Sequence, residues 1–220
     1  MNLVFFDLDH TLLTGDSDAL WCNFLVEQGV LDGRVFIPRN SDIEARYKDG
    51  TIGVEEFANF YVGTLAGRSP RDWEALRQVF LATAIVPRIG DAAKALVTRH
   101  LDDGDLVVMT TATNRFITKL TAAYLGIDHL IATEPQVQDG LFTGRTTGTL
   151  NMRDGKVKRL HAWLAESGLQ LADNYSVAYS DSINDLPLLS AVNRAVAVDP
   201  DALLRGEALA RGWEILLLER

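Results

Sequence analysis

The chain has 220 residues, enough for one or two globular domains, and its 47% hydrophobic and 23% charged content excludes a disordered or fibrous protein. Its 21 Lys and Arg residues against 30 Asp and Glu residues give a formal net charge of −9. Because this charge opposes non-specific binding to nucleic acids and to anionic membranes, we expect no nucleic-acid partner and no stable membrane association.

From the first residues of the chain we expect no secretory targeting signal. Residues 1–13 are apolar, but they lack a basic beginning and are interrupted by Asp7, Asp9 and His10. No run approaches the ~18 apolar residues of a membrane span. The single cysteine, Cys22, can form neither an intramolecular disulfide nor a zinc-thiolate cluster, which fits a reducing compartment. We therefore expect a cytoplasmic location.

Short apolar runs alternate with helical patterns along most of the chain. The runs that predict buried strands are residues 3–6, 106–109, 130–132, 177–179, 195–198 and 214–218. Apolar residues spaced three to four apart predict helices over 89–101, 116–124 and 157–164, and Asp139-Gly140 predicts a hairpin turn within 138–141. This alternation indicates an α/β fold with a mostly parallel sheet and helices on both faces.

Residues 16–86 interrupt this alternation, because they contain no strand-like run and space their apolar residues as a helix does. We interpret them as a helical insertion. Breaks at 31–33, 37–40 and 67–70 would divide it into three or four helices. The insertion follows the first strand directly, so it is placed to cover a site at that strand's carboxyl end.

Two carboxylates follow the first strand. Asp7 and Asp9 stand two residues apart, so both can point into one cavity while Leu8 packs away from it. Carboxylates buried at this spacing repel each other unless a cation or a shared proton relieves them. The alternative is a simple turn or helix cap.

A second acidic pair, Asp181 and Asp185, follows the strand predicted at 177–179. Ligands of open parallel sheets bind at the carboxyl ends of the strands. Hard oxygen ligands there favour Mg²⁺, which retains several waters and bridges to substrate phosphate. Taken alone, the pair can also be a capping residue and a solvated acid of a first helical turn.

Hydroxyl groups end a third strand, and a lysine follows the hairpin. Residues 110–114 lead from the strand into a helix, where hydroxyls and free amides can cradle a phosphate or simply cap the helix. Lys156 lies near the start of the next helix, where it can neutralise a phosphate or remain a surface lysine.

In chain order these motifs resemble those of the haloacid dehalogenase superfamily of phosphohydrolases. The four motifs of that family correspond here to Asp7, Asp9 and Thr11; to Thr111; to Lys156; and to Asp181 with Asp185. The nearest resemblance is to subfamily IB, the phosphoserine-phosphatase-like and histidinol-phosphate-phosphatase-like branch. His10 and Ser180 depart from it, since many members have glycine at both positions.

The resemblance implies a three-layer Rossmann-like core, residues 1–15 and 87–220, and a helical cap of the C1 type, residues 16–86. It also implies a Mg²⁺-dependent phosphatase for a small phosphate monoester. Asp7 would be the nucleophile that forms an aspartyl-phosphate, and Asp9 would be the general acid and base. The family's dehalogenases lack the second acid, so Asp9 favours a phosphate ester as the substrate.

The same resemblance implies roles for the remaining motif residues. Asp7, the main-chain carbonyl of Asp9, and Asp181 would bind the metal. Thr111, Ala112 and Lys156 would hold the phosphoryl oxygens. Thr11, Asn184 and Asp185 would support these groups.

Substrate specificity is expected in the cap. Asp16 falls where phosphoserine phosphatases place an acid that meets the substrate amine, although it can equally cap the helix that starts near Asp18. Arg46 can meet a substrate carboxylate or phosphate, or lie solvated on a helix face.

Other functions remain open at this level. A phosphomutase or phosphotransferase would use the same residues with another hydroxyl in place of water. A lipid-phosphate phosphatase like the phosphatidylglycerophosphatase-like members is a further alternative, against which the net charge argues. A non-enzymatic phospho-switch is disfavoured, because receiver domains phosphorylate an Asp on a middle strand and need no insertion after the first. The sequence does not define the oligomeric state.

Overall fold

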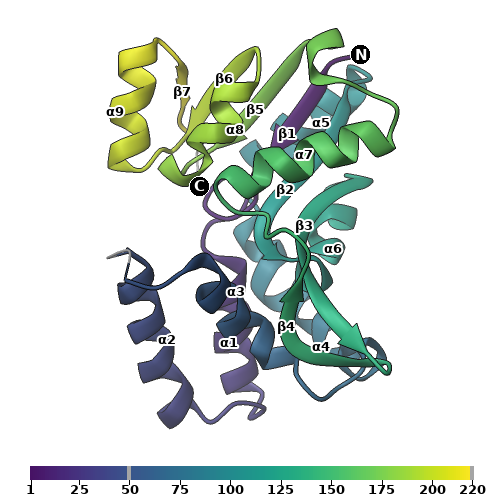
Figure 1. Ribbon diagram of the computed structural model, residues 1–220, viewed down its shortest axis with the longest axis vertical. Helices are drawn as coiled ribbons and strands as arrows, with labels where there is room; N and C mark the ends of the chain where they lie inside the picture. Colours follow the sequence, from purple (N-terminus) through teal and green to yellow (C-terminus); the bar gives the residue numbers. More distant parts are fainter. Residues whose placement is uncertain (49–50, 219–220) are drawn as a thin grey trace.

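The computed structural model describes residues 1–48 and 51–218, which form one sheet with helices on both of its faces (Figure 1). The strands are β1 (Leu3–Phe6), β2 (Leu106–Asn114), β3 (His129–Gln138), β4 (Leu141–Thr147), β5 (Ser176–Ser180), β6 (Arg194–Val198) and β7 (Glu214–Leu216). The helices are α1 (Ser17–Glu27), α2 (Gly33–Lys48), α3 (Val54–Val62), α4 (Pro70–Phe80), α5 (Asp91–Asp102), α6 (Arg115–Tyr124), α7 (Asp154–Glu166), α8 (Leu186–Ala191) and α9 (Ala202–Arg211).

The seven-stranded sheet has the order β4-β3-β2-β1-β5-β6-β7, so the first strand lies at its centre. Every neighbouring pair is parallel except β3 and β4, which are antiparallel. The predicted α/β fold with a mostly parallel sheet is therefore confirmed.

The central strand is buried on both faces, which explains its unbroken apolar sequence. Its side chains point alternately to opposite faces of the sheet. Val4 and Phe6 belong to the buried cluster that includes α5 and α6, whereas Leu3 and Phe5 belong to the cluster that includes α7, α8 and α9. In Figure 1, α7 and α8 lie in front of the sheet and α5 lies behind it.

The hairpin between β3 and β4 turns at Asp139 and Gly140, as predicted. Both residues have positive φ angles, 51° and 79°, as a tight two-residue hairpin turn requires. The hairpin reaches down to the insertion, where the side-chain oxygen of Asn59 in α3 accepts a hydrogen bond from the Thr146 N–H at 2.8 Å (Figure 1).

Several elements extend beyond their predicted limits. Strand β2 continues from residue 109 to Asn114, because its threonines favour extended backbone although they break the apolar run. Residues 110–114 therefore belong to the strand and not to a connection, with a register shift between Thr111 and Asn114. Conversely, β7 ends at Leu216 and not at residue 218.

The insertion is helical, as predicted, but one of its expected breaks is wrong. Residues 37–40 lie inside α2, which runs through Pro38. Proline removes one backbone donor near the start of this helix but does not end it. The break at 67–70 is confirmed, because Ser69 caps α4 through a reciprocal capping box with Asp72 and Pro70 occupies the first turn.

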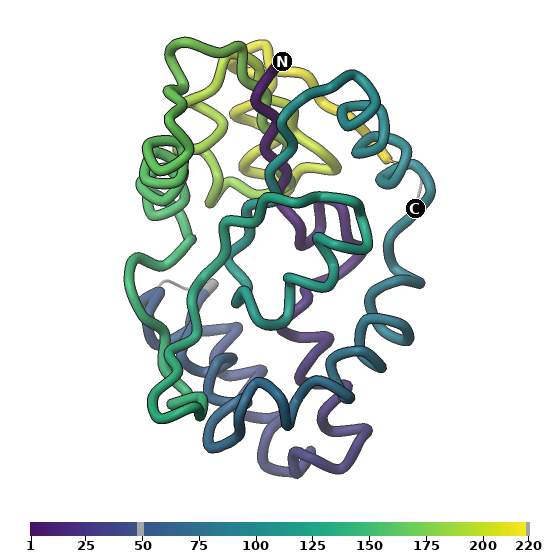
Figure 2. Tube along the Cα trace, turned by 90° about the vertical axis from the view of Figure 1, so that its right-hand side faces the viewer, coloured from purple at the N-terminus to yellow at the C-terminus, as the bar shows by residue number. Residues whose placement is uncertain are grey.

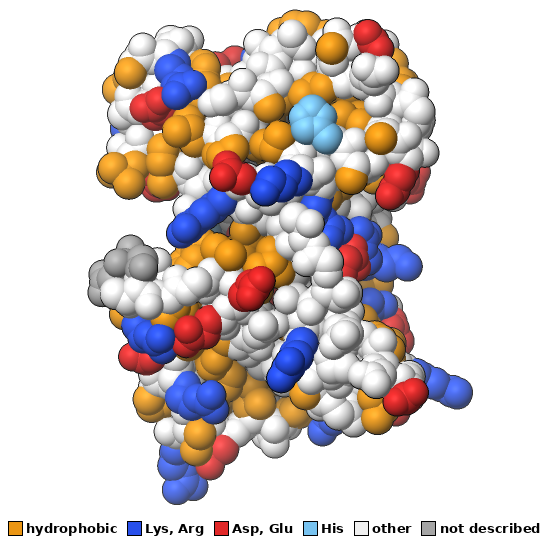
Figure 3. All heavy atoms as spheres, viewed as in Figure 1, with side chains coloured by type: hydrophobic (Ala, Val, Ile, Leu, Met, Phe, Trp, Pro, Cys, Tyr) orange, Lys and Arg blue, Asp and Glu red, His pale blue; other side chains and the backbone are white. Residues whose placement is uncertain are grey.

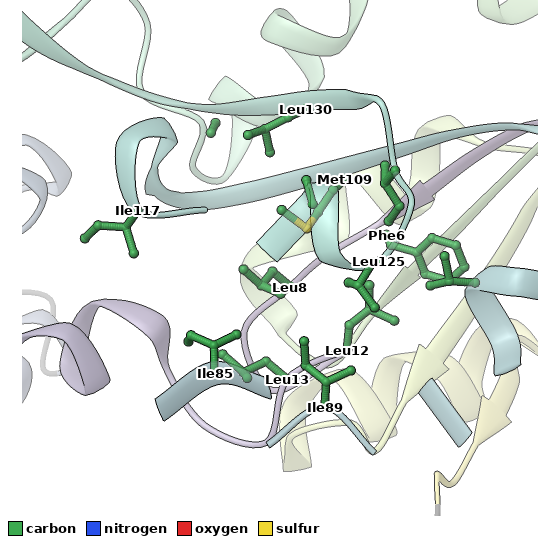
Figure 4. Close-up of a cluster of buried hydrophobic side chains, with 14 of the residues drawn as sticks. Phe6, Leu8, Leu12, Leu13, Ile85, Ile89, Met109, Ile117, Leu125 and Leu130 are labelled. Atoms are coloured by element: carbon green, nitrogen blue, oxygen red, sulfur yellow. The ribbon is translucent and has the colours of Figure 1, made fainter. Parts of the chain in front are cut away.

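The insertion and the sheet share one continuous buried cluster. It joins Phe6 of β1 to Trp21 of α1 and to Trp73 and Phe80 of α4, and the Trp21 and Phe80 rings pack edge to face at 5.1 Å. Figure 4 shows Leu8, Leu12 and Leu13 among side chains from both parts of the chain. The division into a core of 1–15 and 87–220 and a cap of 16–86 stays a prediction.

The insertion lies beyond the carboxyl ends of the parallel strands. Figure 2 shows β1 running from the N-terminus at the top toward the middle of the molecule, with the following helices below it. Among residues 1–48 and 51–218, no helix combines the length and apolar character needed to cross a membrane.

Candidate active site

The two acidic motifs meet where β1 and β5 end side by side. These strands pair in parallel, and the Asp7 N–H donates to the Tyr179 carbonyl at 3.0 Å. Asp7 follows β1 and Asp181 follows β5, so both carboxylates lie at the same edge of the sheet. Leu8, between the two acids of the first motif, is fully buried in the hydrophobic core.

Lys156 joins Asp7 to Asp185 in a buried ion triad. Its Nζ donates to Asp7 Oδ1 and to Asp185 Oδ2, both at 2.6 Å. Ser180 Oγ donates to the same Asp185 oxygen at 2.7 Å. Burial opposes the charged ammonium, but the carboxylates of Asp185 and Asp7 outweigh this and raise the pKa of Lys156. The lysine therefore stays protonated while only 3% exposed.

A tight turn places this lysine. Residues 150–155 approach each other so closely that a Cβ on Gly155 would lie 2.0 Å from the Leu150 carbonyl oxygen. Only glycine fits this backbone contact. Helix α7 begins at Asp154, earlier than the predicted 157, so Lys156 belongs to its first turn.

Thr11 links Asp7 to Asp181 through its hydroxyl group. Its Oγ1 lies 2.9 Å from Asp181 Oδ1 and 3.3 Å from Asp7 Oδ2, and it accepts from the Asp181 N–H at 3.0 Å. Burial raises the pKa of Asp7 well above its ordinary value. The Lys156 ammonium lowers this pKa, whereas the neighbouring carboxylates raise it further. Burial also raises the pKa of Asp181 to about 6.

Asp9 is held by hydrogen bonds from the start of α1 and the end of β2. The Ser17 N–H donates to its Oδ1 at 2.7 Å, and the Thr113 hydroxyl donates to its Oδ2 at 2.9 Å. The Thr111 hydroxyl lies 3.3 Å from the same Oδ2, so this fully buried side chain faces Asp9. The carboxylate is thus oriented by the start of α1 and by the end of β2.

His10 adopts a left-handed backbone with φ of 58°. This region favours glycine, the residue that the family resemblance leads one to expect at this position. The His10 N–H donates to the Gly15 carbonyl at 3.1 Å and closes the loop after Asp9.

These side chains open onto a cavity of about 170 Å³ between the strand ends and the insertion. Its lining residues are Asp7, Asp9, His10, Asp16, Asp18, Tyr47, Phe57, Ala58, Ala112, Thr113, Met152, Arg153, Lys156, Asp181, Ser182, Asn184 and Asp185. Of the residues expected at the site, Thr11, Thr111 and Arg46 do not line it. The first two support lining carboxylates from behind.

Arg46 lies elsewhere on α2. Its guanidinium pairs with Glu56 at 3.0 Å and with Asp42 at 3.5 Å, on side chains that are largely exposed. The next residue, Tyr47, lines the cavity in its place, stacked on Phe57 of α3 at 4.1 Å.

Asp16 lies where it can serve both as a helix cap and as an acid of the cavity, the two roles expected for it. Its side chain caps α1 by accepting from the Ala19 N–H at 2.8 Å, and it also lines the cavity. Burial and the nearby Asp9 raise the pKa of Asp16 to about 7. Asp18 also lines the cavity, although it was not among the residues predicted at the site. Burial, Asp16 and Asp9 raise its pKa well above the ordinary value. The sequence does not mark Asp18 as a site residue, because it lies two residues after a helix cap and acids are common in a first helical turn.

The donor set fits a magnesium ion. Oxygens of Asp7 and Asp181 converge on one hydroxyl, and burial with mutual repulsion disfavours their charged forms unless a cation is present. Within the described residues, no group of three or more His, Cys, Asp or Glu side chains is arranged to hold a metal. The expected set differs from such a group, because it combines two carboxylates with the main-chain carbonyl of Asp9.

Comparisons with known proteins identify the family of this chain. The family model of haloacid dehalogenase-like hydrolases matches residues 4–190. A histidinol-phosphatase of Neisseria meningitidis is 37% identical over 98% of both chains, and the phosphoserine phosphatase SerB1 of Mycobacterium tuberculosis is 33% identical over 96% of this chain and 69% of its own length.

Solved structures give the same fold. A Bordetella pertussis protein of unknown function has a TM-score of 0.92 at 44% identity over 97% of both chains. A phosphoserine phosphatase, solved as a phospho-aspartyl intermediate analogue, has a TM-score of 0.69 over 100% of this chain and 94% of its own, and at 19% identity it supports the fold alone. The phosphatases of this family generally use Mg²⁺. The chain therefore belongs to the haloacid dehalogenase-like hydrolases and is a phosphoric monoester hydrolase of that family.

Proposed function

We propose that this protein is a Mg²⁺-dependent phosphatase that hydrolyses a small phosphate monoester through an aspartyl-phosphate at Asp7. One observation carries the proposal: the Asp7 carboxylate lines the cavity with one oxygen 2.6 Å from Lys156 Nζ and the other facing Thr11. A nucleophile held in one orientation beside a buried cation is suited to in-line attack on phosphorus.

The reaction divides between the two acids of the first motif. An Asp7 oxygen forms a bond to phosphorus as the bond to the leaving oxygen breaks, and Asp9 donates a proton to that oxygen. Asp9 then takes a proton from water, whose oxygen attacks phosphorus and releases Asp7. The hydrogen bonds from Ser17 and Thr113 hold Asp9 in place for both steps.

Lys156 and the end of β2 would bind the phosphoryl oxygens. The lysine keeps its charge while buried, and Ala112 lines the cavity beside Thr113. Asp185 orients the lysine, and Asn184 lies at the cavity wall. Thr111 contributes by supporting Asp9 and not by lining the cavity.

Asp7, Asp181 and the main-chain carbonyl of Asp9 would hold the magnesium ion. When bound, the ion neutralises charge that the nucleophile and the phosphate share. Lys156 favours the ionised form of Asp7 against the effect of burial on its pKa, and a bound magnesium ion would act in the same direction.

We propose an amino-bearing phosphate monoester as the substrate, with phosphoserine and histidinol phosphate as the candidates. Asp16 and Asp18 line the cavity on the side of the insertion and would face a cationic group. The stacked rings of Tyr47 and Phe57 form an adjacent aromatic wall, which suits an imidazole. The names of the relatives from Neisseria and Mycobacterium support the same two compounds.

The experiment is phosphate release from histidinol phosphate, phosphoserine, glycerol phosphates and sugar phosphates, with and without Mg²⁺. Turnover of an amino-bearing compound that requires Mg²⁺ and is lost in Asp7→Asn would support the proposal. Transfer of phosphate to an added alcohol in place of release would favour a phosphotransferase. Turnover that persists in Asp7→Asn would exclude the covalent mechanism.

A further inference from the structure

Arg153 lies at the rim of the cavity without an ionic partner. It lines the cavity, its side chain is exposed, and it forms no ion pair with any residue in the described part of the chain. Its guanidinium carbon lies 5.3 Å from the centre of the Tyr47 ring in α2. The ring face attracts the cation and holds it at the boundary between sheet and insertion.

The charges of the cavity make this position significant. Six carboxylates line it, from Asp7, Asp9, Asp16, Asp18, Asp181 and Asp185. Among the described lining residues, Arg153 and Lys156 carry permanent positive charge, and Lys156 is engaged by two of the carboxylates. A phosphate dianion that enters would therefore meet Arg153 as the cation with free donors.

The backbone at this position is one that arginine rarely adopts. Arg153 has φ of 50° and ψ of −127°, a conformation that glycine adopts without strain. Arg153 lies within a tight turn, in which the Gly155 N–H donates a hydrogen bond to the Met152 carbonyl at 2.8 Å. This turn imposes the strained backbone. Glycine would adopt this backbone without strain, so the arginine occupies the position at a local energetic cost.

Basic side chains are also visible at the surface between the two parts of the molecule (Figure 3). Despite the net charge of −9, Lys and Arg side chains gather along the indentation between the upper and lower parts of the molecule on the face in Figure 3.

We propose that Arg153 is a substrate-binding residue that takes phosphoryl oxygens of the monoester at the rim of the cavity, with the Tyr47 ring fixing its guanidinium. A planar guanidinium can donate two parallel hydrogen bonds to a phosphate. The inference deepens the proposed function and rests on it.

The test compares Arg153→Gly with Arg39→Ala. The first change removes the guanidinium and relieves the backbone. The second removes a similar cation–ring contact, that of Arg39 with Phe60 at 5.9 Å, which lies outside the cavity lining. Three quantities are measured in the presence of Mg²⁺: KM and kcat for the best substrate, the Kd of inorganic phosphate by calorimetry, and Tm.

For Arg153→Gly we expect KM and the phosphate Kd to rise about 10-fold to 100-fold, as for loss of a hydrogen bond to a charged group, with a smaller change in kcat. Its Tm should equal or exceed that of the wild type. Arg153→Lys should recover part of the affinity, and Arg39→Ala should leave both constants unchanged.

Equal KM and equal phosphate Kd in the wild type and Arg153→Gly would overturn the inference. An equal weakening in Arg39→Ala would also overturn it, because the effect would then belong to packing of the insertion. If no compound of the panel is hydrolysed while Arg153→Gly still weakens phosphate binding, the proposed function fails and the inference about Arg153 stands.

Discussion

The ammonium group of Lys156 lies 2.6 Å from a carboxylate oxygen of Asp7, although 149 positions separate the two residues in the chain. This contact joins the first strand to a helix that follows the hairpin. It also places a permanent positive charge beside the proposed nucleophile in a buried setting, where electrostatic interactions are stronger than in water.

Lys156→Met should therefore impair both stability and activity. Removing one partner of a buried ion pair leaves unpaired carboxylates and costs about 3–5 kcal/mol. Loss of a donor to the phosphoryl group should lower kcat about 10²-fold to 10³-fold. Urea unfolding and phosphate release measure the two effects. Lys158→Met, on the exposed side of the same helix, should stay within about 0.5 kcal/mol of the wild type.

Gly155→Ala should disrupt the site through the backbone. The new Cβ would collide with the Leu150 carbonyl oxygen, so the turn must move and displace Lys156. We expect a lower Tm and loss of turnover. Gly206→Ala is the matched control, since its Cβ meets nothing within 4 Å on the exposed side of α9, and it should stabilise the protein by about 0.5–1 kcal/mol. Full activity in Gly155→Ala would contradict this account of the turn.

Asp16→Asn should flatten the dependence of stability on pH. The pKa of Asp16 is about 7 in the folded protein, against an ordinary value of 3.8. The folded state therefore binds more protons between these values, and the free energy of unfolding falls as pH rises from about 4 to 7.

Asparagine keeps the helix cap without the charge. The pKa difference limits the effect of Asp16 on the free energy of unfolding to about 4 kcal/mol. Because the side chain is partly exposed, we expect Asp16→Asn to raise the free energy of unfolding by about 1–3 kcal/mol at pH 8 and by little at pH 4. Urea unfolding at both pH values measures it. If the free energies of unfolding of Asp16→Asn and the wild type differ by the same amount at all pH values, the raised pKa of Asp16 is refuted.

Mg²⁺ should raise the Tm of the wild type, because an ion that binds only the folded state stabilises it, by about 2.7 kcal/mol at 100 times its Kd. Asp181→Asn should lose most of this shift, since it removes one of the two proposed carboxylate ligands. Asp103→Asn, at an exposed helix end far along the chain from both motifs, should retain it. Thermal melts with Mg²⁺ and with a chelator measure the shifts, and an equal shift in Asp181→Asn would argue against the proposed ligand set.

The sequence allowed the fold and the motif residues to be predicted because both depend on local patterns. The apolar run of β1 ending at Asp7 has one simple explanation, a buried strand that presents a carboxylate at its end. Prediction was wrong at Pro38, where α2 continues although the proline removes one backbone donor, and at the end of β2, where polar threonines continue the strand.

The cap side of the cavity was less predictable. Arg46 and Tyr47 are neighbours on α2, yet only the tyrosine lines the cavity, because the orientation of the helix depends on its packing against α3 and not on its own sequence. Asp18 and Arg153 were missed for a different reason, since an acid in a first helical turn and an arginine before a helix are usually solvated.

The sequence by itself determined the alternation of buried strands with helices, the helical insertion, the motif carboxylates and the lysine, because apolar periodicity and residues at strand ends are local properties. Only the tertiary structure decided which of these groups touch, how their pKa values shift, and which side chains of the insertion line the cavity. Those properties depend on distances and burial between segments far apart in the chain, which a linear pattern does not contain.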